Sequence, residues 1–265
     1  MDEYDINRQL LLEHDYRVKL TRYTDDLRTR AVEEKTNYFS TLRNMPLDIV
    51  KSSGMFYIDS MTEMLLPDYL DDLVDFGVIS SANNKPIFNR RWVIPIRDRD
   101  GLVSNLVGYS NEANERYIYG TAKYYRRRDT LYGLENLNLA YKLGYAIRTE
   151  GITDTMRLRS LGYLNTFAMC GTHKSDYINT MFNRLRYGVI DIPDRDKPGK
   201  QAERGWVTNR YIILRTPIMF KDSDEMLKSG EHEGIFRDYM AECIRYITAQ
   251  EHNGVVYPVK EYTII

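Results

Sequence analysis

The sequence is poor in the residues that build several common kinds of site. It contains two cysteines, Cys170 and Cys243, which are too far apart to form a CxxC pair, so neither zinc binding nor a disulfide framework is predicted. Its four histidines show no HExxH spacing. No hydrophobic run approaches the roughly 20 residues that a membrane span needs, and the acidic, polar start does not resemble a secretory signal. These absences predict a cytoplasmic protein.

The chain also has almost no net charge, because 37 basic residues face 38 acidic ones. The charge is unevenly distributed, however. Between Lys85 and Arg128 there are ten basic residues and four acidic ones, a local charge of +6. A basic stretch inside a neutral chain is typical of a phosphate-binding surface. On charge alone, a solvated charged face is an equally good interpretation.

The order of predicted elements indicates an α/β protein, α+β overall. Residues 1–45 are predicted to be helical, and three strands are predicted at 92–96, 102–110 and 117–119. From about residue 134, predicted strands at 145–148, 164–170, 187–192 and 211–219 alternate with helices at 135–142, 153–161, 175–187, 198–208 and 233–249. Such alternation predicts a mainly parallel sheet flanked by helices.

The same pattern divides the chain into four parts. We expect an N-terminal helical segment at 1–45, a basic mixed α/β subdomain at 46–134, a domain with the parallel sheet at 135–232, and a C-terminal helix and tail at 233–265.

Acidic residues follow directly after three of the predicted strands. They form three clusters, Glu150 with Asp154, Asp194 with Asp196, and Asp222 with Asp224. Taken alone, an Asp-x-Asp pair is more often a solvated turn, and the last pair could cap the helix that follows. Ligands of parallel sheets bind at the carboxyl ends of the strands. Carboxylates gathered there repel one another and suit Mg²⁺ or Mn²⁺, so the sequence predicts a site for two or more such ions.

The order of these motifs is similar to the Toprim pattern, in which Glu-Gly-x-x-Asp (150–154) precedes Asp-x-Asp (194–196). The rest of the chain resembles the bacterial DnaG-type primases over about residues 40–235. Residues 91–101 look like the family's R-x-x-F-P-I-x-D-x-x-G, and residues 127–134 look like its K-x-x-x-LYGL. Residues 116–118, 168–172 and 221–224 resemble the P-K-Y-L, A-S-L-G-T and D-P-D stretches.

This resemblance implies a Toprim-like sheet and a DNA primase, which makes short RNA primers on single-stranded DNA from ribonucleoside triphosphates. A replicative helicase is a further partner that the family implies. The implied catalytic residues are Glu150, Asp194 and Asp196, and the implied metal ligands are Glu150, Asp154, Asp194, Asp196, Asp222 and Asp224. Glu150 would be a metal ligand or a general base. Nucleotide or nucleic acid would be bound by Arg91, Arg97, Arg116, Arg127, Gly171 and Thr172, although a surface ion pair is the alternative role for each arginine.

The chain departs from the family pattern at several points. It has no ligands for a zinc ribbon, and about thirty residues after 235 are too few for a helicase-binding domain. Tyr109 stands where a basic residue is expected, and Arg195 replaces the glycine of Asp-Gly-Asp. We therefore expect a minimal phage-type primase, one subunit of a split enzyme, or an excised core. A phage-encoded form would act in the host cytoplasm.

Two other functions fit part of the pattern. A Toprim nuclease would share the acidic residues, but it has no need for the basic stretch upstream. A non-catalytic nucleic-acid-binding protein of the replisome would not need an intact acidic set.

Overall fold

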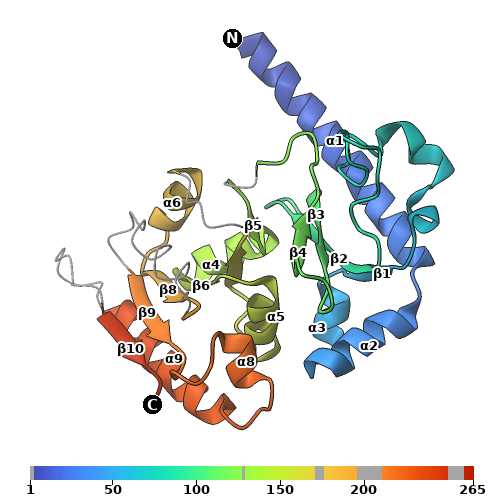
Figure 1. Cartoon of the computed structure of the whole chain (residues 1–265). Coiled ribbons are helices and arrows are strands. Elements are labelled where there is room, and N and C mark those ends of the chain that lie inside the picture. The colour runs from blue at the N-terminus through green and yellow to red at the C-terminus, as the bar shows by residue number, and fades with distance from the viewer. Residues whose placement is uncertain (1–2, 127–128, 171–175, 196–210, 250–259) are drawn as a thin grey trace. The chain divides into compact units, whose positions relative to one another are not determined.

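The computed structural model describes residues 3–126, 129–170, 176–195, 211–249 and 260–265. They belong to two units (Figure 1). The N-terminal unit comprises Met1–Leu42 and Pro46–Tyr125, and the C-terminal unit comprises Arg43–Met45 and Arg126–Ile265. The short segment Arg43–Met45 thus belongs to the second unit although its neighbours on both sides belong to the first.

The N-terminal unit contains a four-stranded antiparallel sheet in the order β1-β2-β3-β4. These strands are β1 (Phe56–Ile58), β2 (Arg91–Arg97), β3 (Val103–Tyr109) and β4 (Tyr117–Tyr119). The helices of this part of the chain are α1 (Glu3–Arg30), α2 (Glu33–Arg43), α3 (Leu47–Ser52) and two 3-10 helices, η1 (Met61–Met64) and η2 (Pro67–Asp72). The tight turn between β2 and β3 places Gly101 at a φ of 82°, which explains the Asp-Gly pair there.

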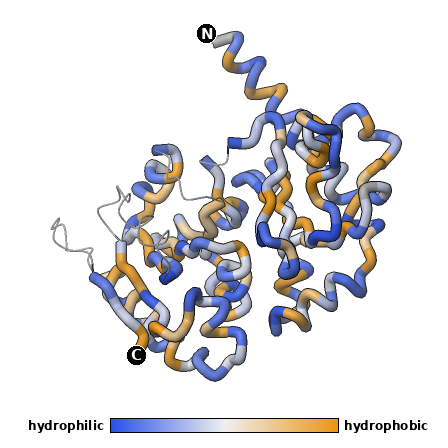
Figure 2. The backbone as a smooth tube through the Cα atoms, in the orientation of Figure 1, coloured by the Kyte–Doolittle hydropathy of each residue, from blue (hydrophilic) through white to orange (hydrophobic). Residues whose placement is uncertain are grey.

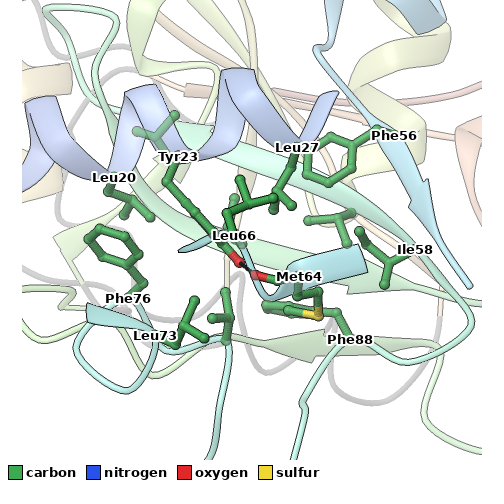
Figure 3. Packing of buried hydrophobic residues seen from close by; sticks show 14 residues of the cluster. Leu20, Tyr23, Leu27, Phe56, Ile58, Met64, Leu66, Leu73, Phe76 and Phe88 are labelled. Atoms are coloured by element: carbon green, nitrogen blue, oxygen red, sulfur yellow. Dashed lines mark hydrogen bonds between the residues drawn. The ribbon is translucent and has the colours of Figure 1, made fainter. Parts of the chain in front are cut away.

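The core of this unit forms where α1 packs against the sheet and the 3-10 helices (Figure 3). Leu20, Tyr23 and Leu27 recur at helical spacing and are all buried, as the sequence pattern predicts. The Tyr23 hydroxyl donates to the Met64 carbonyl at 3.1 Å, so the buried phenol has a partner. Along α1, hydrophilic and hydrophobic residues alternate, as Figure 2 shows.

The C-terminal unit is built around a six-stranded sheet in the order β10-β9-β8-β6-β7-β5. The strands are β5 (Leu131–Tyr132), β6 (Tyr145–Thr149), β7 (Thr166–Met169), β8 (Gly188–Ile192), β9 (Tyr211–Arg215) and β10 (Lys260–Thr263). All neighbouring pairs are parallel except β5 with β7. Its helices are α4 (Leu137–Leu143), α5 (Ile152–Ser160), α6 (Asp176–Asn183), α8 (Ser223–Leu227) and α9 (Glu233–Ala249), with a 3-10 turn η4 (Leu134–Asn136) before α4.

Helices cover both faces of this sheet, because successive residues of its strands enter opposite cores. In β8, Val189 packs with residues of α4 and α6, whereas Ile190 packs with residues of α5, α8 and α9. The buried stripe of α9, Phe236, Met240 and Cys243, lies in the second of these cores. A strand buried on both faces has a continuous hydrophobic sequence, which is why β6, β7, β8 and β9 were predicted from the sequence.

The predicted fold class is confirmed, but the sequence missed three strands. The two residues of β5 and the three of β1 are too short to show a period. β10 lies in the stretch predicted as a helix and tail, and it pairs with β9. The helix predicted at 198–208 lies outside the described residues. None of the helices in the described parts of the chain combines the length and hydrophobicity that a membrane span requires.

An ion pair is buried in the middle of the parallel sheet. Arg148 of β6 and Asp191 of β8 are register partners, and both side chains are fully buried. Nε of Arg148 donates to Oδ1 of Asp191 at 2.5 Å, and Nη2 donates to Oδ2. This bidentate pair joins the two strands just before each reaches the edge where Glu150 and Asp194 follow.

We expect Arg148→Met to lower the free energy of unfolding by about 3–5 kcal/mol, because it leaves the Asp191 carboxylate buried without its main counter-charge. Replacing both partners, as in Arg148→Met with Asp191→Leu, should recover most of that loss. Urea denaturation of the two variants checks this. Equal destabilisation of the single and double variants would show that the loss comes from packing and not from the buried charge.

Candidate active site

Glu150 and Asp154 lie where β6 turns into α5. Glu150 follows the last residue of β6, and Gly151 is the N-cap of α5 with extended backbone angles. A Cβ atom at Gly151 would lie 2.5 Å from Oδ2 of Asp154. The glycine is therefore needed for the close approach of the Asp154 carboxylate and not for a left-handed turn.

Asp154 connects this turn to the start of α8. Its buried Oδ1 accepts hydrogen bonds from the Ser223 hydroxyl and from the Asp224 backbone N–H, both at 2.9 Å. Asp222 is the N-cap of α8, and its Oδ1 accepts from the Glu225 N–H at 2.8 Å. Sequence reasoning had left this capping role open for Asp222.

Asp194 follows β8 and lies beside the loop that leads to α8. Nζ of Lys221 is 3.6 Å from Oδ2 of Asp194, whose side chain is 15% exposed. The next residue, Arg195, donates its backbone N–H to the Lys221 carbonyl at 2.9 Å and its Nε to the Thr216 carbonyl at 2.5 Å. These contacts join the loop after β8 to the loop after β9.

Asp224 is held by two arginines. Nε of Arg157 donates to its Oδ1 at 3.0 Å, and the Arg43 guanidinium pairs with its Oδ2. The Asp224 side chain is 3% exposed. Both oxygens of this predicted ligand are therefore engaged with protein groups.

Four of the predicted acidic residues lie within electrostatic reach of one another. Burial raises the pKa of Asp194 to about 8, and repulsion from Asp154, Glu150 and Asp222 adds to this, while Lys221 opposes it. Burial and repulsion from Asp222 likewise raise the pKa of Asp154 to about 7. The arrangement favours bound protons or bound cations, because either relieves the repulsion.

In the described residues, no three His, Cys, Asp or Glu side chains already form a group that could hold a metal ion. Asp196, the second acid of the Asp-x-Asp motif, lies outside the described residues.

The predicted phosphate-binding arginines differ in their surroundings. Arg91 is 7% exposed and donates to the Glu115 carbonyl at 2.9 Å. Arg97 donates to the Gly101 carbonyl at 2.9 Å, and Arg116 is exposed on the loop before β4. Their contact with phosphate stays a prediction. Three further predicted residues, Arg127, Gly171 and Thr172, lie outside the described residues.

Tyr109 is a core residue of the N-terminal unit. It is buried, its hydroxyl is bonded to the Asn111 side chain, and its ring packs against Phe39, Trp92 and Tyr117. A basic residue at this position would have to bury its charge among these rings.

Comparison with known proteins finds sequence relatives that match about half of the chain. No family model matches the chain. A curated DNA primase of Aquifex aeolicus is 30% identical over 122 residues, and one of Rickettsia conorii is 27% identical over 154 residues. These matches cover 44% and 54% of this chain. The chain spans about a quarter of the length of each relative, 24% in both cases.

Solved structures extend the likeness to nearly the whole chain. The DnaG primase catalytic domain bound to ssDNA matches with a TM-score of 0.71 at 19% identity, covering 92% of this chain and 86% of that one. The E. coli primase catalytic core matches with a TM-score of 0.70 at 18% identity, covering 90% and 86%. This chain has the fold of a DnaG catalytic core. The DnaG-like fold confirms the resemblance inferred from the motifs, with residues 91–97 forming β2 and the LYGL stretch containing β5.

Sequence reasoning missed the residues that support the acids. Arg157 and Arg43 belong to none of the motifs, and Ser223 lies within the stretch 221–224 but was given no role there. The one available signal was the spacing of Asp154 and Arg157 on α5, because residues three apart share a helix face.

We expect the metal-free protein to lose stability as the pH rises from about 4 to about 8. Folding raises the pKa of Asp194 from 3.8 to about 8, so between these values the folded protein holds a proton that the unfolded chain has released. Raising the pH through the folded pKa removes this stabilising contribution. Thermal unfolding in the presence of a chelator, repeated at several pH values, measures how steeply the stability falls with pH. Asp194→Asn should make this fall less steep. An unchanged slope in that variant would contradict the pKa shift.

Proposed function

We propose that the protein is a DNA primase, which joins ribonucleotides opposite a single-stranded DNA template by metal-dependent nucleotidyl transfer. The observation that carries this proposal is the convergence of Glu150, Asp194 and Asp222 from three neighbouring parallel strands, β6, β8 and β9. Burial, together with repulsion from the neighbouring acids, raises the pKa of Asp194 to about 8. The DnaG-like fold of nearly the whole chain supports it.

The donor set fits hard divalent cations. Carboxylate oxygens with water are the ligands that Mg²⁺ and Mn²⁺ prefer, and mutual repulsion of the acids is relieved by a bound cation. Glu150, Asp194, Asp196 and Asp222 would hold the ions, with Asp154 and Asp224 as supporting acids. When bound, such ions activate an attacking hydroxyl and stabilise a leaving pyrophosphate.

The remaining roles belong to the chain's own groups. Glu150 would bind the ion or accept the proton of the attacking 3′-hydroxyl, because it stands at the open end of β6 beside Asp194. Arg97, Arg116 and Arg127 would bind phosphate groups of the template or the nucleotide. Arg91 would bind a phosphate group only if it gave up its hydrogen bond to the Glu115 carbonyl. Asp154 would orient the start of α8 through its bonds to Ser223 and Asp224.

Primer synthesis tests the proposal directly. We expect labelled ribonucleotides to be joined on single-stranded DNA with Mg²⁺ or Mn²⁺. Glu150→Gln and Asp194→Asn should each lower the rate by about 10²–10⁴-fold, the range expected when a group that handles the proton or its metal is lost. Asp238→Asn, an exposed acid on α9, is the matched control and should leave the rate unchanged.

Two outcomes would contradict the proposal. Full activity in both acid variants would remove the acidic site from the mechanism. Degradation of DNA with no primer product would favour a nuclease.

A further inference from the structure

Arg157 of α5 makes hydrogen bonds to three residues in two distant parts of the chain. Nε donates to Oδ1 of Asp224 at 3.0 Å, Nη1 donates to the Asn44 carbonyl at 2.7 Å, and Nη2 donates to the Arg43 carbonyl. The residue is 4% exposed. All three nitrogens of a buried guanidinium are thus engaged, and its charge faces the Asp224 carboxylate.

The segment Arg43–Met45, which begins at the last residue of α2, contacts both ends of α8. At the first turn of α8, the Arg43 guanidinium pairs with Oδ2 of Asp224. At the other end, Nδ2 of Asn44 donates to the carbonyl of Lys228, the C-cap residue, at 2.7 Å. A helix of five residues has little stability of its own, so these contacts are needed to fix its position.

The position of α8 determines where two of the predicted metal ligands lie. Asp222 is the N-cap of α8, and Asp154 is bonded to the Asp224 N–H and the Ser223 hydroxyl in its first turn. A shift of Asp224 would therefore move Asp222 directly and release Asp154 from both of its bonds.

We propose that Arg157 is a positioning residue for the acidic site, which acts through Asp224 to hold Asp222 and Asp154 in place for metal binding. This inference rests on the proposed function in one respect, the assignment of Asp222 as a metal ligand and of Asp154 as a supporting acid of the same site. Arg43 assists by neutralising the second oxygen of Asp224. Lysine cannot replace Arg157 in this role, because one ammonium group cannot reach three acceptors with the fixed geometry of a guanidinium.

The test compares Mn²⁺ affinity in wild type, Arg157→Met and Arg157→Lys by titration calorimetry. Loss of a group that orients metal ligands typically weakens metal binding about 10–100-fold, and we expect both variants to fall in that range. The matched control is Arg159→Met, because Arg159 is on the same helix and is also largely buried, but it pairs with Glu135 and bonds to the Thr166 carbonyl. It should lose stability without losing Mn²⁺ affinity.

A double-mutant cycle separates positioning from simple destabilisation. If Arg157 acts through Asp224, adding Arg157→Met to Asp224→Asn should weaken Mn²⁺ binding no further. Additive losses, or wild-type affinity in Arg157→Lys, would overturn the inference. Should Arg157→Met fail to fold, Arg43→Met removes the second guanidinium from the same carboxylate and should weaken binding in the same direction, and unchanged affinity there would overturn the inference.

The failure of the proposed function would look different. A wild-type protein that binds no Mn²⁺ would refute the metal site itself and the inference with it. Tight Mn²⁺ binding in wild type, lost in Asp194→Asn but retained in Arg157→Met, would leave the proposed function standing and refute only the role of Arg157.

Discussion

Mutual repulsion among carboxylates is the constraint on which the C-terminal unit depends. Parallel strands β6, β8 and β9 lie side by side, so the acids that follow them meet at one edge of the sheet. Burial and like charge together raise the pKa values of Asp194 and Asp154. Several ionised carboxylates gathered at one buried edge destabilise the folded protein, and bound protons or cations remove this destabilisation. Binding of a cation at this edge would therefore be coupled to the stability of the fold.

Buried arginines stabilise the edge of the sheet where these acids lie. The Arg148–Asp191 pair joins β6 to β8 just before their acids, and Arg157 with Arg43 holds Asp224 at the start of α8. Backbone and side-chain bonds from Arg195 join the two loops that bear Asp194 and Asp222. Each contact fixes a loop that carries an acid, so the acids are brought together by several independent connections.

The sequence predicted the parallel sheet because its strands are hydrophobic on both faces. It predicted that the acids lie near one another because they follow the ends of neighbouring strands. Very short strands such as β1 and β5 show no period. β10 was missed because its four residues, Lys260–Thr263, are mostly polar and only Tyr262 is buried. The roles of Arg157 and Arg43 were beyond sequence reasoning, since their partner Asp224 is 67 and 181 positions away. The close approach of the Asp154 carboxylate to Gly151 likewise depends on the folded structure and is not visible in the sequence.

Localised cleavage by bound iron tests most directly whether a cation is held by these acids. Fe²⁺ takes the place of Mg²⁺ in oxygen-ligand sites and, with ascorbate and peroxide, cuts the backbone close to where it is bound. A shared metal site predicts cuts near Glu150, Asp194 and Asp222, suppressed by excess Mg²⁺ and absent in Asp194→Asn. Cuts confined to other parts of the chain, or cuts at only one of the three segments, would contradict a shared metal site.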